Sequence, residues 1–365
     1  MQEELLMRRA LELARRGAGR VSPNPMVGCV IARGGRVIGE GWHETCGGPH
    51  AERNALAACT EDPAGATLYV TLEPCCHWGR TPPCTDAILE RGIARVVVGC
   101  TDPNPLVDGK GVRLLREAGV EVETGVLEQE CWRLNEVFFH FIQHRTPFVV
   151  YKYAMTLDGK TASASGDSRW VSGEAARCRV HEVRGQLSAI MVGVDTVLAD
   201  DPLLTCRIPG GRDPLRIVCD SRARTPLDSR LIQSAGEIPT IIAAAGWNER
   251  AAALKKAGAQ ILLCGERDGR VDLRELMRQL GARGVDSILL EGGTTLAFAA
   301  LEAGIVRKVQ AYIAPKLLGG STARTPAGGQ GLARMADAWR LTGLTAEPVG
   351  EDFLLEGYLP CSQDL

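Results

Sequence analysis

The chain has 365 residues, a length that predicts two domains rather than one. Hydrophobic residues make up 45% of the sequence and charged residues 24%, as in ordinary globular proteins. The net charge of −2 gives no basic surplus for binding nucleic acid or an anionic membrane surface. The longest apolar runs, such as residues 297–301, are far too short to span a bilayer.

The first part of the chain alternates segments with helical and strand-like patterns. Apolar residues at helical spacing, with glycine stops, predict helices over residues 3–16, 51–58, 85–90, 111–118 and 128–140. Short apolar runs predict strands over residues 26–31, 37–39, 68–72, 96–99 and 120–122. This alternation indicates an α/β layered sheet, and we expect the first domain to cover residues 1–145.

A second α/β series follows, and we expect its domain to cover residues 146–365. Strands are predicted over residues 148–151, 189–194, 216–219, 240–244, 261–264 and 287–290. Helices are predicted over residues 172–184 and 273–280 and after the glycine pair at 292–293. Residues 198–206 and 319–331 are expected to be loops.

Thirteen cysteines are scattered through the chain, an odd number that argues against a disulfide framework. Several, such as Cys29, Cys100 and Cys219, lie in apolar runs, where a free cysteine behaves as a small hydrophobic residue. The N-terminus also lacks the basic and apolar segments of a secretory signal. We therefore expect a cytoplasmic protein in which two of the cysteines are metal ligands.

The tripeptide containing His50 and Glu52, followed by a Pro-Cys pair at Cys75 and by Cys84, carries the clearest chemistry. This order is typical of zinc-dependent nucleobase deaminases. The histidine and two thiolates hold zinc, a fourth position is open to water, and the glutamate moves protons. The tripeptide alone is weak evidence, but its combination with Pro-Cys after a strand is specific.

The spacing of the two cysteines is unusual for this pattern. Eight residues separate Cys75 from Cys84, whereas the usual pair is two residues apart. Cys76 and His77 lie within this insertion and are rival metal ligands on chemical grounds alone. The position of Cys75 directly after proline favours it as the first thiolate ligand.

The second domain has no Gly-x-Gly-x-x-Gly after a strand, so a Rossmann dinucleotide site is not supported. Gly293, Thr294 and Thr295 follow a predicted strand and open a helix, where backbone N–H groups can cradle a pyrophosphate. Ser221 and the arginines after it can hold a 2′-phosphate and favour NADP over NAD. Glycine pairs and arginine-rich turns are also common in ordinary loops.

Two segments of the first domain resemble a known family. Residues 74–84 read Pro-Cys-Cys-His-Trp-Gly-Arg-Thr-Pro-Pro-Cys, and residues 22–28 read Ser-Pro-Asn-Pro-Met-Val-Gly. Both resemble the bifunctional deaminase–reductase family of riboflavin biosynthesis, in which the long cysteine spacing is normal. The resemblance implies that one zinc ion is held by His50, Cys75 and Cys84, with Glu52 as the proton shuttle.

The same resemblance suggests substrate contacts in the first domain. Asn24 and His43 are candidates for binding the pyrimidine, and Arg80 is a candidate for binding the substrate phosphate. Arg80 is equally well explained as a solvated loop charge. His43 is equally well explained as a structural hydrogen-bonding residue.

Three segments of the second domain, residues 155–162, 194–202 and 314–319, are similar to the family's reductase domain. The implied NADPH contacts are Ala154, Trp170, Thr196, Asp200, Ser221, Gly293, Thr294 and Thr295. The implied contacts to the sugar-phosphate substrate are Ser168, Arg184, Leu204, Arg207 and Glu291. Lys152 and Glu291 are candidates for orienting and polarising the substrate near the reduced carbon. The alternative is that they form a structural salt bridge.

The resemblance implies a cytidine-deaminase-like α/β/α layered domain followed by an α/β domain similar to dihydrofolate reductase. The first would deaminate 2,5-diamino-6-(5-phosphoribosylamino)pyrimidin-4-one, and the second would reduce the ribosyl group to ribityl with NADPH. We expect a homo-oligomer, a dimer or tetramer, that binds neither nucleic acid nor membrane. One alternative is another nucleobase deaminase fused to a reductase, although the lack of a basic surplus argues against a tRNA substrate. The other is a non-catalytic zinc-stabilised binding protein, but structural zinc usually has four protein ligands.

Overall fold

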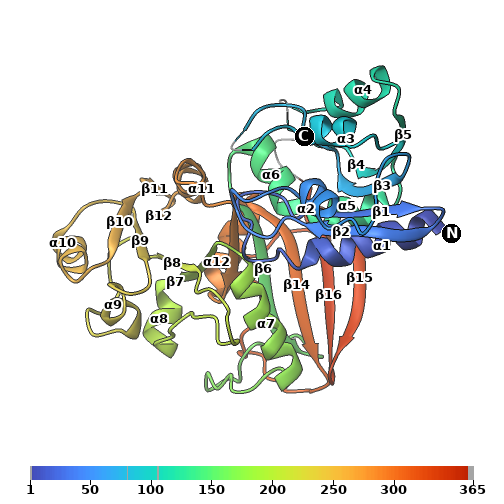
Figure 1. Cartoon of the computed structure of the whole chain (residues 1–365). Helices are drawn as coiled ribbons and strands as arrows, with labels where there is room; N and C mark the ends of the chain where they lie inside the picture. The colour runs from blue at the N-terminus through green and yellow to red at the C-terminus, as the bar shows by residue number, and fades with distance from the viewer. Residues whose placement is uncertain (1, 80, 105–106, 361–365) are drawn as a thin grey trace. The chain divides into compact units, whose positions relative to one another are not determined.

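The computed structural model describes residues 2–79, 81–104 and 107–360 (Figure 1). The chain divides into two compact units, Met1–Arg145 and Thr146–Leu365. Among the described residues, no helix is both long and apolar enough to cross a membrane.

The first unit is built on a five-stranded sheet with the strand order β2-β1-β3-β4-β5. Its strands are β1 (Gly28–Arg33), β2 (Arg36–Trp42), β3 (Thr67–Leu72), β4 (Arg95–Cys100) and β5 (Glu121–Thr124). Strand β1 pairs antiparallel with β2 and β3, whereas β3, β4 and β5 run parallel. The carboxyl ends of the parallel strands therefore share one edge of the sheet.

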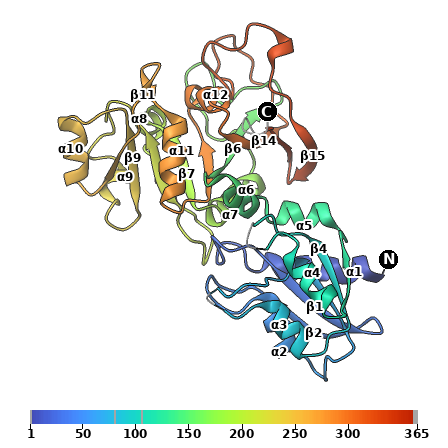
Figure 2. The ribbon, with the colours of Figure 1, turned by 90° about the horizontal axis from the view of Figure 1, so that it is seen from above.

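Helices cover both faces of this sheet (Figure 2). One face carries α2 (Ala51–Ala57), α3 (Cys84–Glu90) and α4 (Lys110–Glu117). The other carries α1 (Gln2–Arg15), α5 (Glu128–Leu134) and α6 (Glu136–His144). Successive β1 side chains enter opposite cores, with Cys29 and Ile31 on the first face and Val30 on the second. The predicted α/β/α layering is confirmed.

The prediction of one continuous helix over residues 128–140 was wrong, because α5 ends at Leu134 and α6 begins at Glu136. The residue between them, Asn135, uses its side chain to bind the backbone of Met26. Asn135 Oδ1 accepts the Met26 N–H at 2.8 Å, and Asn135 Nδ2 donates to the Met26 carbonyl at 2.9 Å. This tertiary contact leaves no signal in the helical periodicity.

The second unit contains a nine-stranded sheet in the order β10-β9-β8-β7-β13-β6-β14-β16-β15. Its strands are β6 (Phe148–Thr156), β7 (Ala189–Gly193), β8 (Leu215–Cys219), β9 (Thr240–Ala244), β10 (Gln260–Leu263), β13 (Ser287–Glu291), β14 (Val306–Ala314), β15 (Thr342–Val349) and β16 (Asp352–Tyr358). In this spatial order, the first seven strands, β10-β9-β8-β7-β13-β6-β14, are parallel. Strands β16 and β15 then add antiparallel pairs at one edge (Figure 1). A separate hairpin consists of β11 (Glu266–Arg267) and β12 (Arg270–Val271).

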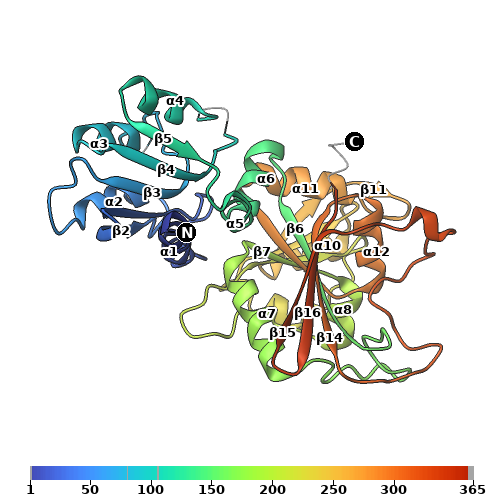
Figure 3. The same ribbon diagram turned by 90° about the vertical axis from the view of Figure 1, so that its right-hand side faces the viewer.

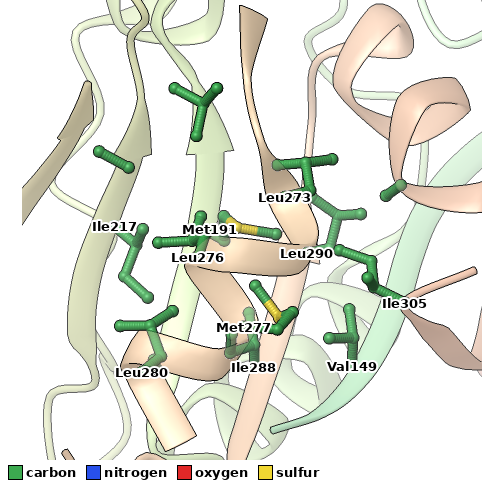
Figure 4. Packing of buried hydrophobic residues seen from close by; sticks show 14 of the residues in the cluster. Val149, Met191, Ile217, Leu273, Leu276, Met277, Leu280, Ile288, Leu290 and Ile305 are labelled. Atoms are coloured by element: carbon green, nitrogen blue, oxygen red, sulfur yellow. The ribbon is translucent and has the colours of Figure 1, made fainter. Parts of the chain in front are cut away.

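The helices of this unit are α7 (Glu174–Gln186), α8 (Val194–Asp200), α9 (Arg230–Gln233), α10 (Glu249–Lys256), α11 (Leu273–Ala282) and α12 (Thr294–Glu302), with a 3₁₀ turn at Met335–Asp337. Helix α11 packs Leu276 and Leu280 against strand residues such as Ile217 and Leu290 (Figure 4). Burying each of these leucines stabilises the fold by roughly 1.5–3 kcal/mol. Helix α7 packs separately, against Tyr312 of β14 and Leu354 of β16 (Figure 3).

Two expectations for the second unit were wrong. Residue 194, expected to end a strand, and residues 198–200, expected in a loop, belong to helix α8. Strands β14, β15 and β16 were not predicted. Strand β15 is almost wholly exposed and contains Gly343, which weakens a strand, and Pro348, which fits an edge strand because it cannot donate a ladder hydrogen bond. It therefore lacks the alternation of apolar residues that marks a half-buried strand.

Candidate active sites

Three side chains of the first unit form a group that can hold a metal ion. The ligand atoms of His50, Cys75 and Cys84 all lie within 4.8 Å of one another. His50 Nδ1 is 3.4 Å from Cys75 Sγ and 3.3 Å from Cys84 Sγ. Nitrogen and sulfur ligands of a tetrahedral zinc are roughly 3.5 Å apart, given the usual metal–ligand bond lengths. The donor set and its spacing thus fit zinc.

The backbone brings the two cysteines together across the long insertion. Cys75 follows β3, whereas Cys84 is the first residue of α3. The Cys75 carbonyl accepts the backbone N–H groups of Cys84 at 3.0 Å and Thr85 at 3.2 Å. The start of α3 is therefore tied to the end of β3, whatever the length of the loop between them.

A second tie links this loop to the helix that carries the histidine. Arg53 on α2 donates to the carbonyls of Pro82 at 3.3 Å and Pro83 at 2.8 Å. Because His50 directly precedes α2, this contact fixes the distance from the histidine to Cys84.

Glu52 lies on the first turn of α2 and is only 3% exposed. Burial, followed by the nearby Cys75 thiolate, raises the pKa of Glu52 to about 7. Hydrogen bonds with Cys84 and His50 lower the pKa of Cys75 and favour its thiolate form. The pocket thus combines a thiolate metal ligand with a carboxyl group that can take up and release a proton.

Asn24 and His43, the predicted pyrimidine contacts, lie against each other beside His50. His43 Nδ1 is 3.0 Å from the Pro49 carbonyl, and its Nε2 is 3.1 Å from Asn24 Nδ2. The rings of His43 and His50 meet edge to face with centroids 5.5 Å apart. Burial lowers the pKa of His43, so the neutral ring donates to Pro49 and accepts from Asn24. Among the described residues none donates to Asn24 Oδ1, so this oxygen can accept a hydrogen bond from a ligand.

The remaining predictions for this unit concern the inserted loop. Arg80 lies outside the residues that the structure describes. Cys76 and His77, the rival ligands, are not part of the metal-binding group found among the described residues. Thr81, which the sequence reasoning missed, places its hydroxyl 3.4 Å from His50 Nε2. This contact can orient the imidazole from the side opposite the thiolates.

All the residues proposed for the second site line one cavity of about 1550 Å³. They are Lys152, Ala154, Ser168, Trp170, Arg184, Thr196, Asp200, Leu204, Arg207, Ser221, Glu291, Gly293, Thr294 and Thr295. Many of them lie at or just after the carboxyl ends of parallel strands β6, β7, β8 and β13. This edge is where open α/β sheets bind ligands.

The turn between β13 and α12 has the shape of a phosphate cradle. Gly292 and Gly293 have positive φ angles of 75° and 80°. A Cβ atom on Gly292 would lie 3.2 Å from the hydroxyl of Thr196, so this side of the turn has little spare room. Thr294 and Thr295 begin α12 and line the cavity, and the first N–H groups of a helix have no partner within it and can bind an anion. The turn therefore fits a dinucleotide pyrophosphate.

Arg184, Glu291 and Lys152 form a buried ionic network in this cavity. Arg184 Nε and Nη2 each donate to a Glu291 carboxylate oxygen at 2.8 Å, and Lys152 Nζ is 4.0 Å from that carboxylate. Despite burial, the two cations lower the pKa of Glu291 to about 2. Burial lowers the pKa of Lys152. Because Arg184 is engaged with Glu291, Arg207 is the freer guanidinium for a substrate phosphate.

Sequence reasoning missed the basic cavity residues Arg177 and His181 on α7. Arg177, His181 and Arg184 are spaced four and three residues apart, so they share one face of the helix, and all line the cavity. That spacing was the signal that could have identified them. The Arg177 guanidinium stacks 4.7 Å from the centre of the Trp170 ring. Arg177 thus supports the indole, which is 63% exposed and lines the cavity.

Lys316 was also missed as a residue that holds Trp170. Its ammonium group donates to the carbonyls of Trp170 at 3.0 Å and Val171 at 2.9 Å. Lys316 lies in the 314–319 segment, whose importance came only from the family resemblance. Its partners lie some 145 residues earlier, too far for any local pattern to reveal.

Comparison with known families agrees with this two-site arrangement. Residues 1–100 match the model for the cytidine and deoxycytidylate deaminase zinc-binding region. Residues 147–355 match the model for the RibD C-terminal domain. The matched regions contain the metal-binding group and nearly all of the second unit.

Whole-length relatives carry both regions. The riboflavin biosynthesis protein RibD of Actinobacillus pleuropneumoniae is 54% identical over 351 residues, covering 96% of this chain and 93% of that protein. RibD of Escherichia coli strain K12 is 43% identical over 371 residues, covering 97% and 99%. A solved Thermotoga maritima structure is described as a diaminohydroxyphosphoribosylaminopyrimidine deaminase/5-amino-6-(5-phosphoribosylamino)uracil reductase. It is 38% identical and has a TM-score of 0.85. The match covers 98% of this chain and 99% of the solved chain.

Proposed function

The chain belongs to the RibD family of bifunctional deaminase–reductases in riboflavin biosynthesis, and we propose that each unit carries one of its two activities. The fold class expected from the sequence, a cytidine-deaminase-like domain followed by a reductase domain similar to dihydrofolate reductase, is confirmed. Zinc and NADPH are the cofactors of this enzyme. In our proposal, Met1–Arg145 holds the deaminase site and Thr146–Leu365 the reductase site.

The observation that carries the deaminase proposal is Glu52 buried beside a metal-binding group with only three protein ligands. A zinc ion held by His50, Cys75 and Cys84 would supply a water molecule of lowered pKa for attack on the amino-bearing ring carbon. Glu52 takes up the proton of that water and delivers it to the departing nitrogen as ammonia leaves. Asn24 and His43 are proposed to bind the pyrimidine, with His43 fixing the orientation of the Asn24 amide.

The metal-ligand assignment predicts that replacing both Cys75 and Cys84 with serine reduces zinc content from about one per chain to near zero. Serine hydroxyls stay protonated at neutral pH and do not replace thiolate ligands. Metal analysis of the purified protein measures the change. A Cys46→Ser/Cys178→Ser variant is the matched control, because both are exposed cysteines outside the metal-binding group. Full zinc occupancy in the first variant would refute the assignment.

For the reductase, we propose that the cofactor's pyrophosphate lies on the Gly293–Thr295 turn and that Trp170, Ala154, Thr196, Asp200 and Ser221 complete the NADPH contacts. The proposed contacts to the sugar-phosphate substrate are Ser168, Arg184, Leu204, Arg207 and Glu291. The hydride comes from NADPH, so the protein supplies orientation and proton transfer. The lowered pKa of Lys152 makes its ammonium a stronger acid than usual and suits it to donate a proton near the reduced carbon.

The support that Lys316 gives Trp170 predicts a selective defect in cofactor binding. Lys316→Met removes both hydrogen bonds to the 170–171 backbone. We expect NADPH affinity to fall roughly tenfold, or about 1.4 kcal/mol, because the two hydrogen bonds are exposed and hold the backbone at Trp170 and Val171, not the cofactor itself. A fluorescence titration with NADPH measures the affinity, and Lys316→Arg should retain most of it. A rise in the KM of the ribosyl substrate with unchanged NADPH affinity would contradict this role.

We propose that the chain assembles as a homo-oligomer, a dimer or tetramer, and acts in the cytoplasm. Large apolar side chains are exposed in the C-terminal part of the second unit, including Met335, Leu344 and Phe353. Leu344 lies on β15, the edge strand of the large sheet, where a second copy can cover it. The described cysteines are all free thiols, as in a reducing compartment. Light scattering of the purified protein distinguishes these assemblies from a monomer.

One assay tests the proposed function as a whole. Purified protein is given 2,5-diamino-6-(5-phosphoribosylamino)pyrimidin-4-one, and ammonia release and NADPH consumption are measured separately. We expect ammonia without NADPH present, and NADPH oxidation only after deamination. Absence of either signal from the zinc-loaded protein would refute the corresponding half of the proposal.

A further inference from the structure

The acid at the end of strand β8 is turned away from the cofactor cavity. In Rossmann enzymes, which have a different fold, an acidic residue binds the ribose 2′-hydroxyl and favours NAD over NADP. Here Asp220 is fully buried, and its Oδ2 accepts the backbone N–H of Thr225 at 2.7 Å and the Thr225 hydroxyl at 2.8 Å. Its carboxylate therefore neither binds a ribose diol nor repels a phosphate in its place.

The next residue, Ser221, lines the cavity, and its hydroxyl donates to no acceptor in the described part of the chain. Ser221 Oγ accepts the backbone N–H of Val271 at 3.0 Å. The acceptor role is thereby filled by a fixed partner, so the hydroxyl proton remains for a ligand oxygen. The same hydrogen bond attaches the β11–β12 hairpin to the loop after β8, some 50 residues earlier. Val271 is buried in the core, which anchors the hairpin.

This attachment brings Arg270 to the same cavity as Ser221 and the arginines that follow it. Arg224 is engaged with Asp195 at 2.8 Å. Within the part of the chain that the structure describes, the guanidinium groups of Arg222 and Arg270 have no ion-pair or hydrogen-bond partner. Two unpaired guanidinium groups and a donating hydroxyl thus line the same cavity, while the buried Asp220 carboxylate does not.

Resting on the proposed reductase function, we infer that Arg270, together with Ser221 and Arg222, binds the 2′-phosphate of NADPH and makes the enzyme selective for NADPH over NADH. Guanidinium groups bind phosphate bidentately and keep their charge at any physiological pH. The β11–β12 hairpin, which is separate from the nine-stranded sheet, then determines cofactor specificity because it carries Arg270.

The test compares Arg270→Ala with Arg267→Ala in the full chain. Arg267 is also exposed and lies in the same hairpin, but it does not line the cavity. Calorimetry measures the binding of adenosine 2′,5′-bisphosphate and of 5′-AMP, which lacks the 2′-phosphate. We expect Arg270→Ala to weaken bisphosphate binding roughly 10- to 100-fold without weakening 5′-AMP binding, and Arg267→Ala to change neither. Arg270→Lys, which keeps a positive charge, should recover part of the loss.

Steady-state kinetics supplies a second measurement, since the ratio of kcat/KM for NADPH to that for NADH should fall by a similar factor in Arg270→Ala. Equal bisphosphate binding by Arg270→Ala and Arg267→Ala would overturn the inference. An equal loss of bisphosphate and 5′-AMP binding would overturn it as well, because the residue would then hold the adenosine or the fold. If the unmodified chain fails to oxidise NADPH on the deaminated substrate, the proposed function fails instead.

Discussion

Glu52→Gln is expected to abolish deamination while leaving NADPH oxidation on the deaminated substrate intact. The amide has nearly the same shape as the carboxyl group but cannot accept the proton of the attacking water. Positioned proton transfer contributes roughly 100- to 10,000-fold to such reactions, so we expect a rate loss of that order. Ammonia release from the diaminopyrimidine substrate, with NADPH omitted, measures it.

The control lies within the same polypeptide, because the proposed reductase residues all belong to the second compact unit. Zinc content should stay near one per chain, since Glu52 is not among the three metal-binding residues. Loss of both activities in a folded, zinc-loaded variant would contradict the assignment of separate sites. Loss of zinc would instead show that Glu52 supports the metal site.

The spatial grouping of the first site follows from a pattern that the sequence displays. The spacing of His50, Glu52, Cys75 and Cys84 identifies a metal site because each residue lies at the end of a predicted strand or the start of a predicted helix. The structure then gathers the proposed ligand atoms within 4.8 Å. The particular residues of the second cavity came from family resemblance, since they are distributed over some 140 residues with no periodic signal.

What the sequence does not reveal are contacts formed only in three dimensions. The Asn135–Met26 hydrogen bonds divide a helix that periodicity predicts as continuous. The Lys316 support of Trp170 and the Ser221–Val271 hydrogen bond join segments far apart in the chain. Edge strand β15 lacks apolar alternation because almost none of its side chains enter a core. Local propensity carries none of this information.

Arg184→Met is expected to destabilise the second unit by about 3 kcal/mol at neutral pH, because it removes the bidentate partner of the buried Glu291 carboxylate and leaves Lys152 and His181 as its basic neighbours. Removing one partner of a buried ion pair usually costs about 3–5 kcal/mol. Lowering the pKa of Glu291 from 4.5 to about 2 leads to a similar figure of about 3 kcal/mol. Chemical denaturation measures the loss. Arg179→Met, on the same helix but in an exposed pair with Glu182, should cost no more than about 0.5 kcal/mol.

The pH dependence of this loss identifies its cause. A carboxyl group whose pKa is lowered on folding stabilises the native state fully above its unfolded pKa, and that stability disappears as pH falls toward the folded value. The difference between Arg184→Met and the unmodified chain should therefore be greatest above pH 4.5 and shrink as the pH falls toward about 2. Adding Glu291→Gln to Arg184→Met removes the stranded charge and should restore part of the stability. A pH-independent difference, or a double variant less stable than Arg184→Met alone, would mean that Arg184 stabilises the unit through packing instead of charge.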